Sequence, residues 1–217
     1  MVPMKIDVWS DIACPFCYIG KRHLEQALAK MNLKGEVEIV WRSYLLDPGF
    51  EYTEGQTLTQ VLAEKKGWSQ DYARQMNEQV SSMARSAGLN YEIDKTIPAN
   101  TLKAHQLLHL AKQKNKQNDL KESFFKAYFI EGKNLNSNDV LKSIAVEHGL
   151  NEKEIETTLQ LGNFSNDVST DVQIAQQIGV RGVPFFVFDE KYALSGAQPI
   201  DTFITVLQKL EEEKNPA

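Results

Sequence analysis

The sequence predicts an α/β fold in which a long all-helical segment interrupts a small sheet, in the order β-α-β, helical insertion, β-β-α. Three observations predict this order. A strand-like run over residues 4–9 leads at once into an amphipathic helical pattern. Strand signals nearly vanish from residue 55 to residue 162, where capped helical patterns follow one another. Two short apolar runs separated by a polar turn, within residues 185–195, then precede a closing helix.

The amino-terminal part has the pattern of a β-α-β unit. Residues 4–9 (Met-Lys-Ile-Asp-Val-Trp) form the expected first strand, and a helical pattern extends over residues 18–31. A second strand is expected at residues 37–41, before the Asp-Pro-Gly turn at 47–49. Units of this kind place both strands parallel in one sheet, joined by a right-handed crossover.

Residues 55–162 carry a succession of amphipathic helices. Apolar residues recur there at spacings of three and four, with polar residues at the starts and glycines at several ends. We therefore expect two domains: a sheet domain of residues 1–54 plus 163–217, and an inserted helical domain of residues 55–162. The expected N-caps are Thr57, Ser69, Asn100, Ser137 and Asn151.

The carboxy-terminal part is expected to return to the sheet through a helix over residues 164–178. The run Phe-Phe-Val-Phe at 185–188 is aromatic and β-branched, and a polar turn separates it from a second short run at 192–195. This spacing predicts an antiparallel hairpin. Pro199 then opens the closing helix, whose apolar residues recur at helical spacing.

Both cysteines of the chain, Cys14 and Cys17, lie three positions apart between the first strand and the first helix. If Cys14 is the helix N-cap, Pro15 stands at the first helical position, which suits proline. The free N–H groups and the dipole of the helix then favour a thiolate. Cysteines in such positions have pKa values of roughly 3.5–7.5, against ~8.5 for a free thiol. We therefore expect Cys14 to be an exposed nucleophile with a lowered pKa, and Cys17 to be a more buried resolving thiol.

Two other interpretations of the cysteine pair are weaker. A structural zinc site needs four ligands, and the chain has no third cysteine. Its histidines show no paired metal-ligand spacing in this interpretation, so no metal is expected. Two inert core cysteines are the second alternative, but a strand before the pair and a helix after it are typical of a redox dithiol. The histidines are His23, His105, His109 and His148.

Composition and charge narrow the expected partners. The net charge is −5 and no long basic run occurs, so nucleic acid is not an expected partner. No apolar run approaches the ~18–20 residues of a membrane span, so no membrane partner is expected. Residues 1–4 lead into a strand without the apolar core of a signal peptide. With one cysteine pair at redox spacing and no other cysteine, we expect a cytoplasmic protein.

The element order, the Cys-Pro-Phe-Cys motif at residues 14–17 and the Gly-Val-Pro run at residues 182–184 together resemble the thioredoxin superfamily. More closely, the chain resembles the DsbA-like branch with an inserted helical domain, and within that branch the FrnE-like proteins. The cysteine pair joined to a distant Val-Pro at a strand start is a specific combination. The stretches that carry the resemblance are residues 7–11, 14–21, 100–101, 104–105, 182–186 and 195–199.

The resemblance implies a cis peptide bond between Val183 and Pro184, facing the Cys14 sulfur, with the Val183 backbone paired to a bound substrate chain. Phe16 stands where DsbA-type oxidants carry a histidine, and it cannot donate a hydrogen bond or a charge. We therefore expect the pKa of Cys14 to be lowered less than in DsbA. The expected reduction potential lies between the landmarks of about −120 mV for DsbA and about −270 mV for thioredoxin. Phe16 is also expected to be exposed and to contact substrate.

Three further residues have two interpretations each. Asp11 is either a turn residue or a carboxylate that assists proton transfer near the thiols. Asn100 is a helix N-cap on local grounds, and His105 is a helix-surface or core histidine. The resemblance implies that Asn100 and His105 could line a cleft over Cys14.

The predicted function is thiol–disulfide exchange, in which Cys14 reacts with protein or small-molecule substrates and Cys17 resolves the mixed disulfide. No bound cofactor is expected, and glutathione is a candidate redox partner. Two alternatives remain open. Kappa-class glutathione transferases and 2-hydroxychromene-2-carboxylate isomerases share the fold with a helical insertion, but they usually have serine in place of Cys14. A non-catalytic holdase or binding module would instead use the surface of the insertion.

Overall fold

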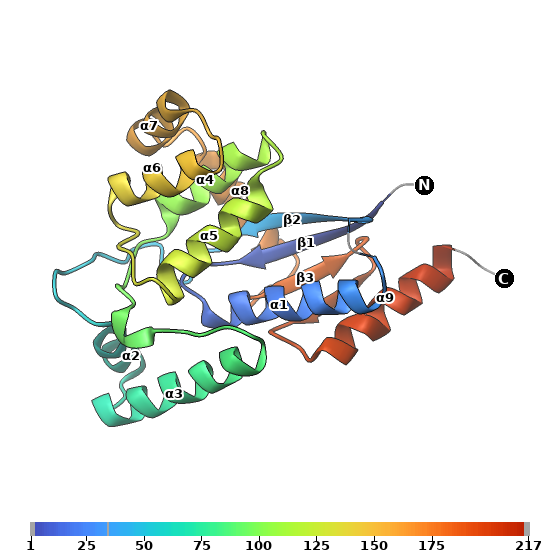
Figure 1. Ribbon diagram of the computed structural model, residues 1–217, viewed down its shortest axis with the longest axis horizontal. Coiled ribbons are helices and arrows are strands. Elements are labelled where there is room, and N and C mark those ends of the chain that lie inside the picture. Colours follow the sequence, from blue (N-terminus) through green and yellow to red (C-terminus); the bar gives the residue numbers. More distant parts are fainter. Residues whose placement is uncertain (1–2, 34, 215–217) are drawn as a thin grey trace.

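The structure is a computed structural model that describes residues 3–33 and 35–214 (Figure 1). Its sheet has four strands in the order β2-β1-β3-β4. β1 is parallel to β2 and antiparallel to β3, and β3 is antiparallel to β4. The predicted α/β class, with a helical segment between a β-α-β unit and a β-β-α unit, is confirmed. The strands are β1 (Met4–Ser10), β2 (Val37–Ser43), β3 (Phe185–Phe188) and β4 (Tyr192–Ser195).

Helices cover both faces of the sheet. α1 and α9 contact each other on one face, and α8 contacts β2 on the other face (Figure 1). No helix within residues 3–33 and 35–214 is long and apolar enough to cross a membrane. The helices are α1 (Pro15–Lys30), α2 (Leu58–Lys66), α3 (Gln70–Ser86), the 3-10 helix η1 (Ile93–Lys95), α4 (Leu102–Lys112), α5 (Gln117–Phe129), α6 (Asn138–Glu147), α7 (Glu152–Leu161), α8 (Ser165–Gln177) and α9 (Ile200–Lys214).

The alternation of side chains along β1 determines what each face of the sheet buries. Ile6 points to one face and belongs to a buried cluster with Leu24 of α1 and Phe203 of α9. Trp9 belongs to a separate buried cluster with Ala175 of α8. Its indole N–H donates a hydrogen bond to the backbone of α8 at 2.9 Å. β1 is therefore buried on both faces, as a central strand covered by helices should be.

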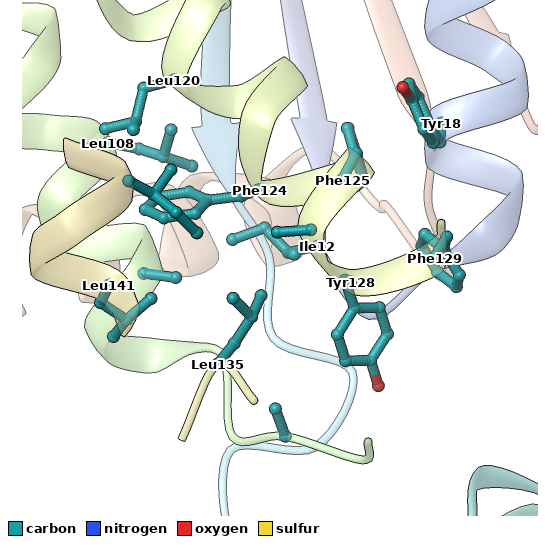
Figure 2. Close-up of a cluster of buried hydrophobic side chains, with 14 of the residues drawn as sticks. Ile12, Tyr18, Leu108, Leu120, Phe124, Phe125, Tyr128, Phe129, Leu135 and Leu141 are labelled. Carbon is teal, nitrogen blue, oxygen red and sulfur yellow. The ribbon is translucent and has the colours of Figure 1, made fainter. Parts of the chain in front are cut away.

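The start of α1 shares a core with the helical segment over residues 55–162. Ile12 and Tyr18 belong to the same buried cluster as Phe124 and Phe125 of α5. Figure 2 shows this cluster, with the ring of Tyr18 opposite that of Phe125. The two ring centres lie 4.8 Å apart and the planes are 8° from parallel. The division into a sheet domain and an inserted domain stays a prediction, and the shared core joins the two parts at the thiols.

Several expected element boundaries differ from the structure by one to three residues; for example, β1 extends to Ser10 and α1 begins at Pro15. β2 extends to Ser43, beyond the predicted end at Trp41, because Ser43 still pairs with the last residue of β1. The N-cap of α4 is Thr101 rather than Asn100. The side chain of Asn100 nevertheless accepts a hydrogen bond from the amide of Leu102 at 3.0 Å, so its capping contact is present one residue before the cap.

Gly20 marks a close approach between α1 and the strand that follows the Val183–Pro184 bond. A Cβ at this position would lie 3.0 Å from Cγ of Pro184 and 3.1 Å from Cζ of Phe186. Both neighbours are rings held in place by their own packing, and the Phe186 side chain is fully buried. The helix can lie this close to the strand because its residue at the contact has no side chain.

We expect Gly20→Ala to destabilise the protein by roughly 1–3 kcal/mol, because the added methyl group overpacks the contact with Pro184 and Phe186. An exposed helix position would instead gain stability from the same change. The measurement is the midpoint of urea unfolding. The matched control is Gly49→Ala, where nothing lies within 4 Å of the added Cβ. Equal midpoints for the two variants would contradict the packing argument.

Candidate active site

The two cysteines stand at the start of α1, where no side chain makes a capping hydrogen bond. Cys14 is the N-cap residue, with an extended backbone (φ −92°, ψ 112°), and Pro15 is the first helical residue. The amide of Cys17 donates to the carbonyl of Cys14 at 3.0 Å, which closes the first turn. Both cysteines are free thiols. The helix begins here because proline suits a position whose N–H has no intrahelical partner.

Both thiols are buried. Cys17 is fully enclosed, and only 4% of Cys14 is exposed. The expectation of an exposed Cys14 is therefore wrong for this structure, although Cys17 is the more buried of the two. Tyr91 of the inserted segment packs in the same cluster and donates a hydrogen bond to the carbonyl of Pro15 at 2.7 Å. The insertion thus closes over the helix start, while Phe16 remains 37% exposed.

The Val183–Pro184 bond is cis, and the loop that contains it lies against Cys14. The Cys14 thiol donates to the carbonyl of Val183 at 3.4 Å. The carbonyl of Pro184 accepts from the amide of Gly196 at 2.8 Å, which ties this loop to the end of β4. The fold therefore brings together Cys14 and Val183, which lie 169 positions apart in the sequence.

The pKa of the Cys14 thiol is raised well above its ordinary value. The largest cause is its hydrogen bond with the Cys17 side chain, followed by burial, and the negative charges of Cys17 and Asp11 act in the same direction. The backbone N–H of Cys17 acts in the opposite direction. The expectation of a lowered pKa is therefore wrong for this closed, reduced pair, because the buried acidic neighbours outweigh the helix N-terminus.

Asp11 is buried and accepts hydrogen bonds from three separate segments. Its carboxylate accepts from the amide of Ala13 at 3.2 Å, the amide of Leu46 at 2.8 Å and the hydroxyl of Thr101 at 2.7 Å. Nε2 of His105 lies 3.4 Å away. Burial raises the pKa of Asp11, but these donors and the charge of His105 outweigh it and lower the pKa overall. The contact with Ala13 fits the interpretation of Asp11 as a turn residue, and the contacts with Leu46 and Thr101 tie that turn to two other segments.

A chain of buried polar contacts continues from His105 through Ser43, at the end of β2, to Asp171 of α8. Oγ of Ser43 lies 3.1 Å from Nδ1 of His105 and 3.1 Å from Nε2 of His109. The same nitrogen of His109 lies 3.2 Å from the carboxylate of Asp171, which also pairs with Arg42 at 3.2 Å. His105 and His109 are four residues apart on α4, and therefore lie on one face of the helix. The sequence interpretation that found no paired spacing among the histidines overlooked this relation.

These two histidines serve a hydrogen-bonded network. Burial lowers the pKa of His105, although its hydrogen bond with Asp11 acts against this. Among the residues that the structure describes, no group of three or more His, Cys, Asp or Glu side chains is arranged to hold a metal ion. Ser43 and Asp171 carried no local sequence signal for a role near the site, because each is an ordinary polar residue of a strand or a helix.

A cavity of about 530 Å³ opens beside the residue that precedes Cys14. Its lining includes Ala13, Leu46 and Phe50, together with the side chains of two lysines. Asn100 supports one wall, because its amide donates to the carbonyl of Phe50 at 3.1 Å and to that of residue 48 at 3.3 Å. None of the hydrogen bonds of Asn100 within the described part of the chain reaches Cys14. The structure thus places Asn100 behind the cavity wall and not against the thiols.

A family model, a curated protein and solved structures each match nearly the whole chain. The family model of the DSBA-like thioredoxin domain matches residues 5–208. A probable DsbA oxidoreductase from Streptomyces coelicolor is 36% identical, with a TM-score of 0.91 over 99% of this chain and 92% of that one. The uncharacterized protein YwbO of Bacillus subtilis is 26% identical over 96% of this chain and 98% of its own length. A 2-hydroxychromene-2-carboxylate isomerase shares the fold, with a TM-score of 0.71 and 15% identity over 97% of each chain.

We expect the protein to lose stability in acid through Asp11 and His105. The lowered folded pKa of Asp11 adds stability that is present above its ordinary value of 3.8 and is lost as the pH falls through the folded value. The lowered folded pKa of His105 acts in the same direction below 6.5, because the unfolded chain binds that proton first. The free energy of unfolding, measured by urea at a series of pH values, should therefore fall from about pH 6.5 downward.

The variant Asp11→Asn isolates the carboxylate. At neutral pH it should cost roughly 2 kcal/mol, because charge-assisted hydrogen bonds to buried groups are lost. This difference from the unchanged protein should shrink as the pH falls through the Asp11 titration. The control is Asp71→Asn, whose side chain is 90% exposed. A difference that stays constant with pH would show that the charge of Asp11 does not stabilise the fold.

Proposed function

Because the chain belongs to the DsbA-like thioredoxin domain family, we propose that it is a thiol–disulfide oxidoreductase whose reacting pair is Cys14 and Cys17. The family assignment supports an enzyme of the thiol–disulfide kind. The observation that carries the proposal is local: two free thiols stand at the start of α1, and one of them contacts the cis Val183–Pro184 loop at 3.4 Å.

In the proposed reaction, the thiolate of Cys14 attacks one sulfur of a substrate disulfide R–S–S–R′. A bond forms between Cys14 and that sulfur, and R′–S⁻ leaves and takes up a proton. The thiolate of Cys17 then attacks Sγ of Cys14, and the second substrate sulfur leaves as R–SH. The substrate gains two electrons and the protein holds the Cys14–Cys17 disulfide. The reverse sequence oxidises a substrate dithiol.

Access to Cys14 requires that the substrate replace contacts now made within the protein. The Val183 carbonyl, which accepts from the Cys14 thiol, is the group that a substrate chain would engage once that thiol has reacted. Phe16 and Leu46 are exposed hydrophobic side chains, at 37% and 52%. We propose that they receive apolar parts of the substrate at the rim of the thiol site.

The ionisation of Cys14 indicates the redox character of the pair. A raised pKa means that the reduced protein gains little from holding Cys14 as a thiolate, so the reduced form is stabilised less than in a strong oxidant. Phe16 adds no donor that would change this. We therefore propose that the reduction potential of the Cys14–Cys17 pair lies between about −270 mV and about −120 mV.

Three finer assignments belong to the same proposal. The stretches around the cysteines and the Val-Pro run favour the FrnE-like subgroup. A single cysteine pair at redox spacing favours a reducing compartment, the cytoplasm, where such pairs are catalytic. Glutathione is the proposed small-molecule redox partner. Of the two lysines that line the cavity next to Ala13, Lys65 already pairs with Asp47, and Lys66 would suit a glutathione carboxylate.

We expect Cys14→Ser to abolish exchange and Cys17→Ser to accumulate mixed disulfides, because the first change removes the nucleophile and the second removes the resolving thiol. The measurement equilibrates each protein in graded glutathione buffers, quantifies free thiol and identifies adducts by mass. The unchanged protein should show one reversible two-electron transition. Full exchange activity in Cys14→Ser would refute the mechanism. The absence of a reversible transition, with glutathione-dependent turnover of a hydroxychromene carboxylate, would favour the isomerase class instead.

The variant Phe16→His tests the role of the residue between the cysteines. Histidine can donate a hydrogen bond or a positive charge to the Cys14 thiolate, whereas phenylalanine cannot. The potential of the pair should therefore rise by about 30 mV or more, which corresponds to about 1.4 kcal/mol. Phe16→Leu is the control, because it changes the shape of the side chain without adding a donor. A potential that shifts equally in both variants would show that only packing matters at this position.

A further inference from the structure

Lys121 is a buried charged residue that the proposed exchange reaction does not yet use. It comes from α5 of the inserted segment, and none of its surface is exposed. Its ammonium donates one long hydrogen bond, to the carbonyl of Ser10 at 3.4 Å. It also lies 5.0 Å from the ring centre of Phe125 and 5.7 Å from that of Trp41. Figure 2 shows Phe125 on the side of α5 that faces Tyr18 and α1.

The surroundings of Lys121 leave its charge without a carboxylate partner. The other buried lysine at the start of α1, Lys21, pairs with Glu25 and with Glu122, the latter at 2.6 Å. Within the part of the chain that the structure describes, no carboxylate lies within salt-bridge distance of Lys121. Beside it, the hydroxyl oxygen of Ser10 is buried without a hydrogen-bond partner in the same described residues. An ammonium in apolar surroundings is costly unless another charge compensates it.

The compensating groups are the two thiols and one carboxylate. Cys17 packs in the same buried cluster as Phe125, the ring that Lys121 contacts, and it makes the largest favourable electrostatic contribution to the charged form of Lys121. Burial lowers the pKa of Lys121 to about 8, and the three acidic groups act against this shift, so the side chain is mainly an ammonium at neutral pH. The titratable groups that face it are Asp11 of the turn before α1, Cys14, Cys17 and Lys21 at the start of α1, and His105 of α4.

We propose that the ammonium of Lys121 is the buried counter-ion of the Cys17 thiolate and thereby promotes the resolving step. Lys121 is a positioning residue in this role, because it acts on the charge of Cys17 and does not contact the substrate. The inference rests on the proposed function. It adds that the inserted helical segment supplies part of the redox site.

Cys17 is the thiol that needs such a partner. It is fully enclosed, so water cannot stabilise its thiolate, whereas Cys14 lies next to the Val183 loop and the amide of Cys17. Asp11 does not need the lysine, because amide and hydroxyl donors already satisfy its carboxylate. The unpaired cation and the most enclosed thiol therefore complement each other.

The balanced step begins at the mixed disulfide between Cys14 and a substrate sulfur. Cys17 loses its proton, and the ammonium of Lys121 holds the resulting negative charge. The Cys17 sulfur then forms a bond with Sγ of Cys14, and the bond from Cys14 to the substrate breaks. The substrate leaves with the electron pair as R–S⁻ and takes up the proton that Cys17 gave up, so that R–SH is released with no net gain or loss of protons.

The test measures the reactions of Cys14 and Cys17 as two separate kinetic phases. The reduced protein is mixed with an aromatic disulfide whose released thiolate absorbs visible light. The first release reports the attack by Cys14 and depends on reagent concentration, whereas the second reports the attack by Cys17 and does not. In Lys121→Met the second release should slow about tenfold or more at neutral pH, the fold-change that corresponds to about 1.4 kcal/mol of lost thiolate stabilisation. The second release should also require a higher pH to reach half its maximum rate.

The control variant is Lys126→Met, which removes a lysine from the same helix at a position where the side chain is 58% exposed. It should leave both phases unchanged. Lys121→Met should fold at least as well as the unchanged protein, because an apolar side chain of similar length replaces an unpaired buried charge. Lys121→Gln serves as a second neutral variant.

The outcomes distinguish this inference from the proposed function. If the unchanged protein releases no second equivalent of thiol, the dithiol mechanism itself fails. If the unchanged protein does release a second equivalent, but Lys121→Met shows the same second phase and the same pH dependence, the role of Lys121 is refuted. Unfolding of both neutral variants would likewise overturn it, because Lys121 would then be required for folding itself.

Discussion

The carboxylate of Asp11 holds together the three segments that form the thiol site. It accepts hydrogen bonds from the turn before α1, from the loop after β2 and from Thr101 at the start of α4. Hydrogen bonds to an ionised acceptor are roughly twice as strong as neutral ones. The backbone carbonyl of Asp11 also accepts from the amide of Cys14. The turn that presents Cys14 therefore cannot move without disturbing contacts to a helix 90 positions away in the sequence.

A shared hydrophobic core also holds the start of α1 against the helical segment over residues 55–162. The buried side chains at the start of α1 pack with those of α5 instead of forming a core of their own, as the stacking of Tyr18 on Phe125 shows. The helical segment thus does more than border the site, because it encloses both thiols. Enclosure raises the cost of a thiolate at Cys14, and that cost shapes the redox behaviour proposed for the pair.

Charges around the thiols are arranged so that each buried group meets a specific partner. His105 and His109 are connected through Ser43, and Asp171 joins that chain to Arg42 near the surface. Such networks are stabilising only when every member has a partner. Lys121 is the exception among these groups, because none of the carboxylates in residues 3–33 and 35–214 pairs with it, and this is the ground for the role proposed for it beside Cys17.

The family resemblance predicted that the loop at Val183–Pro184 lies beside the thiols, and no local pattern did. The sequence by itself determined the order of the elements and the position of Cys14 at a helix start. Periodicity, proline and turn residues are local signals, and local signals are sufficient for these features. Only the tertiary structure decided that Cys14 is enclosed, that its pKa is raised and that Lys121 is buried against Ser10, Trp41 and Phe125. Burial and electrostatic neighbours depend on segments that meet across the fold, and a lysine has the same local pattern in a core as on a surface.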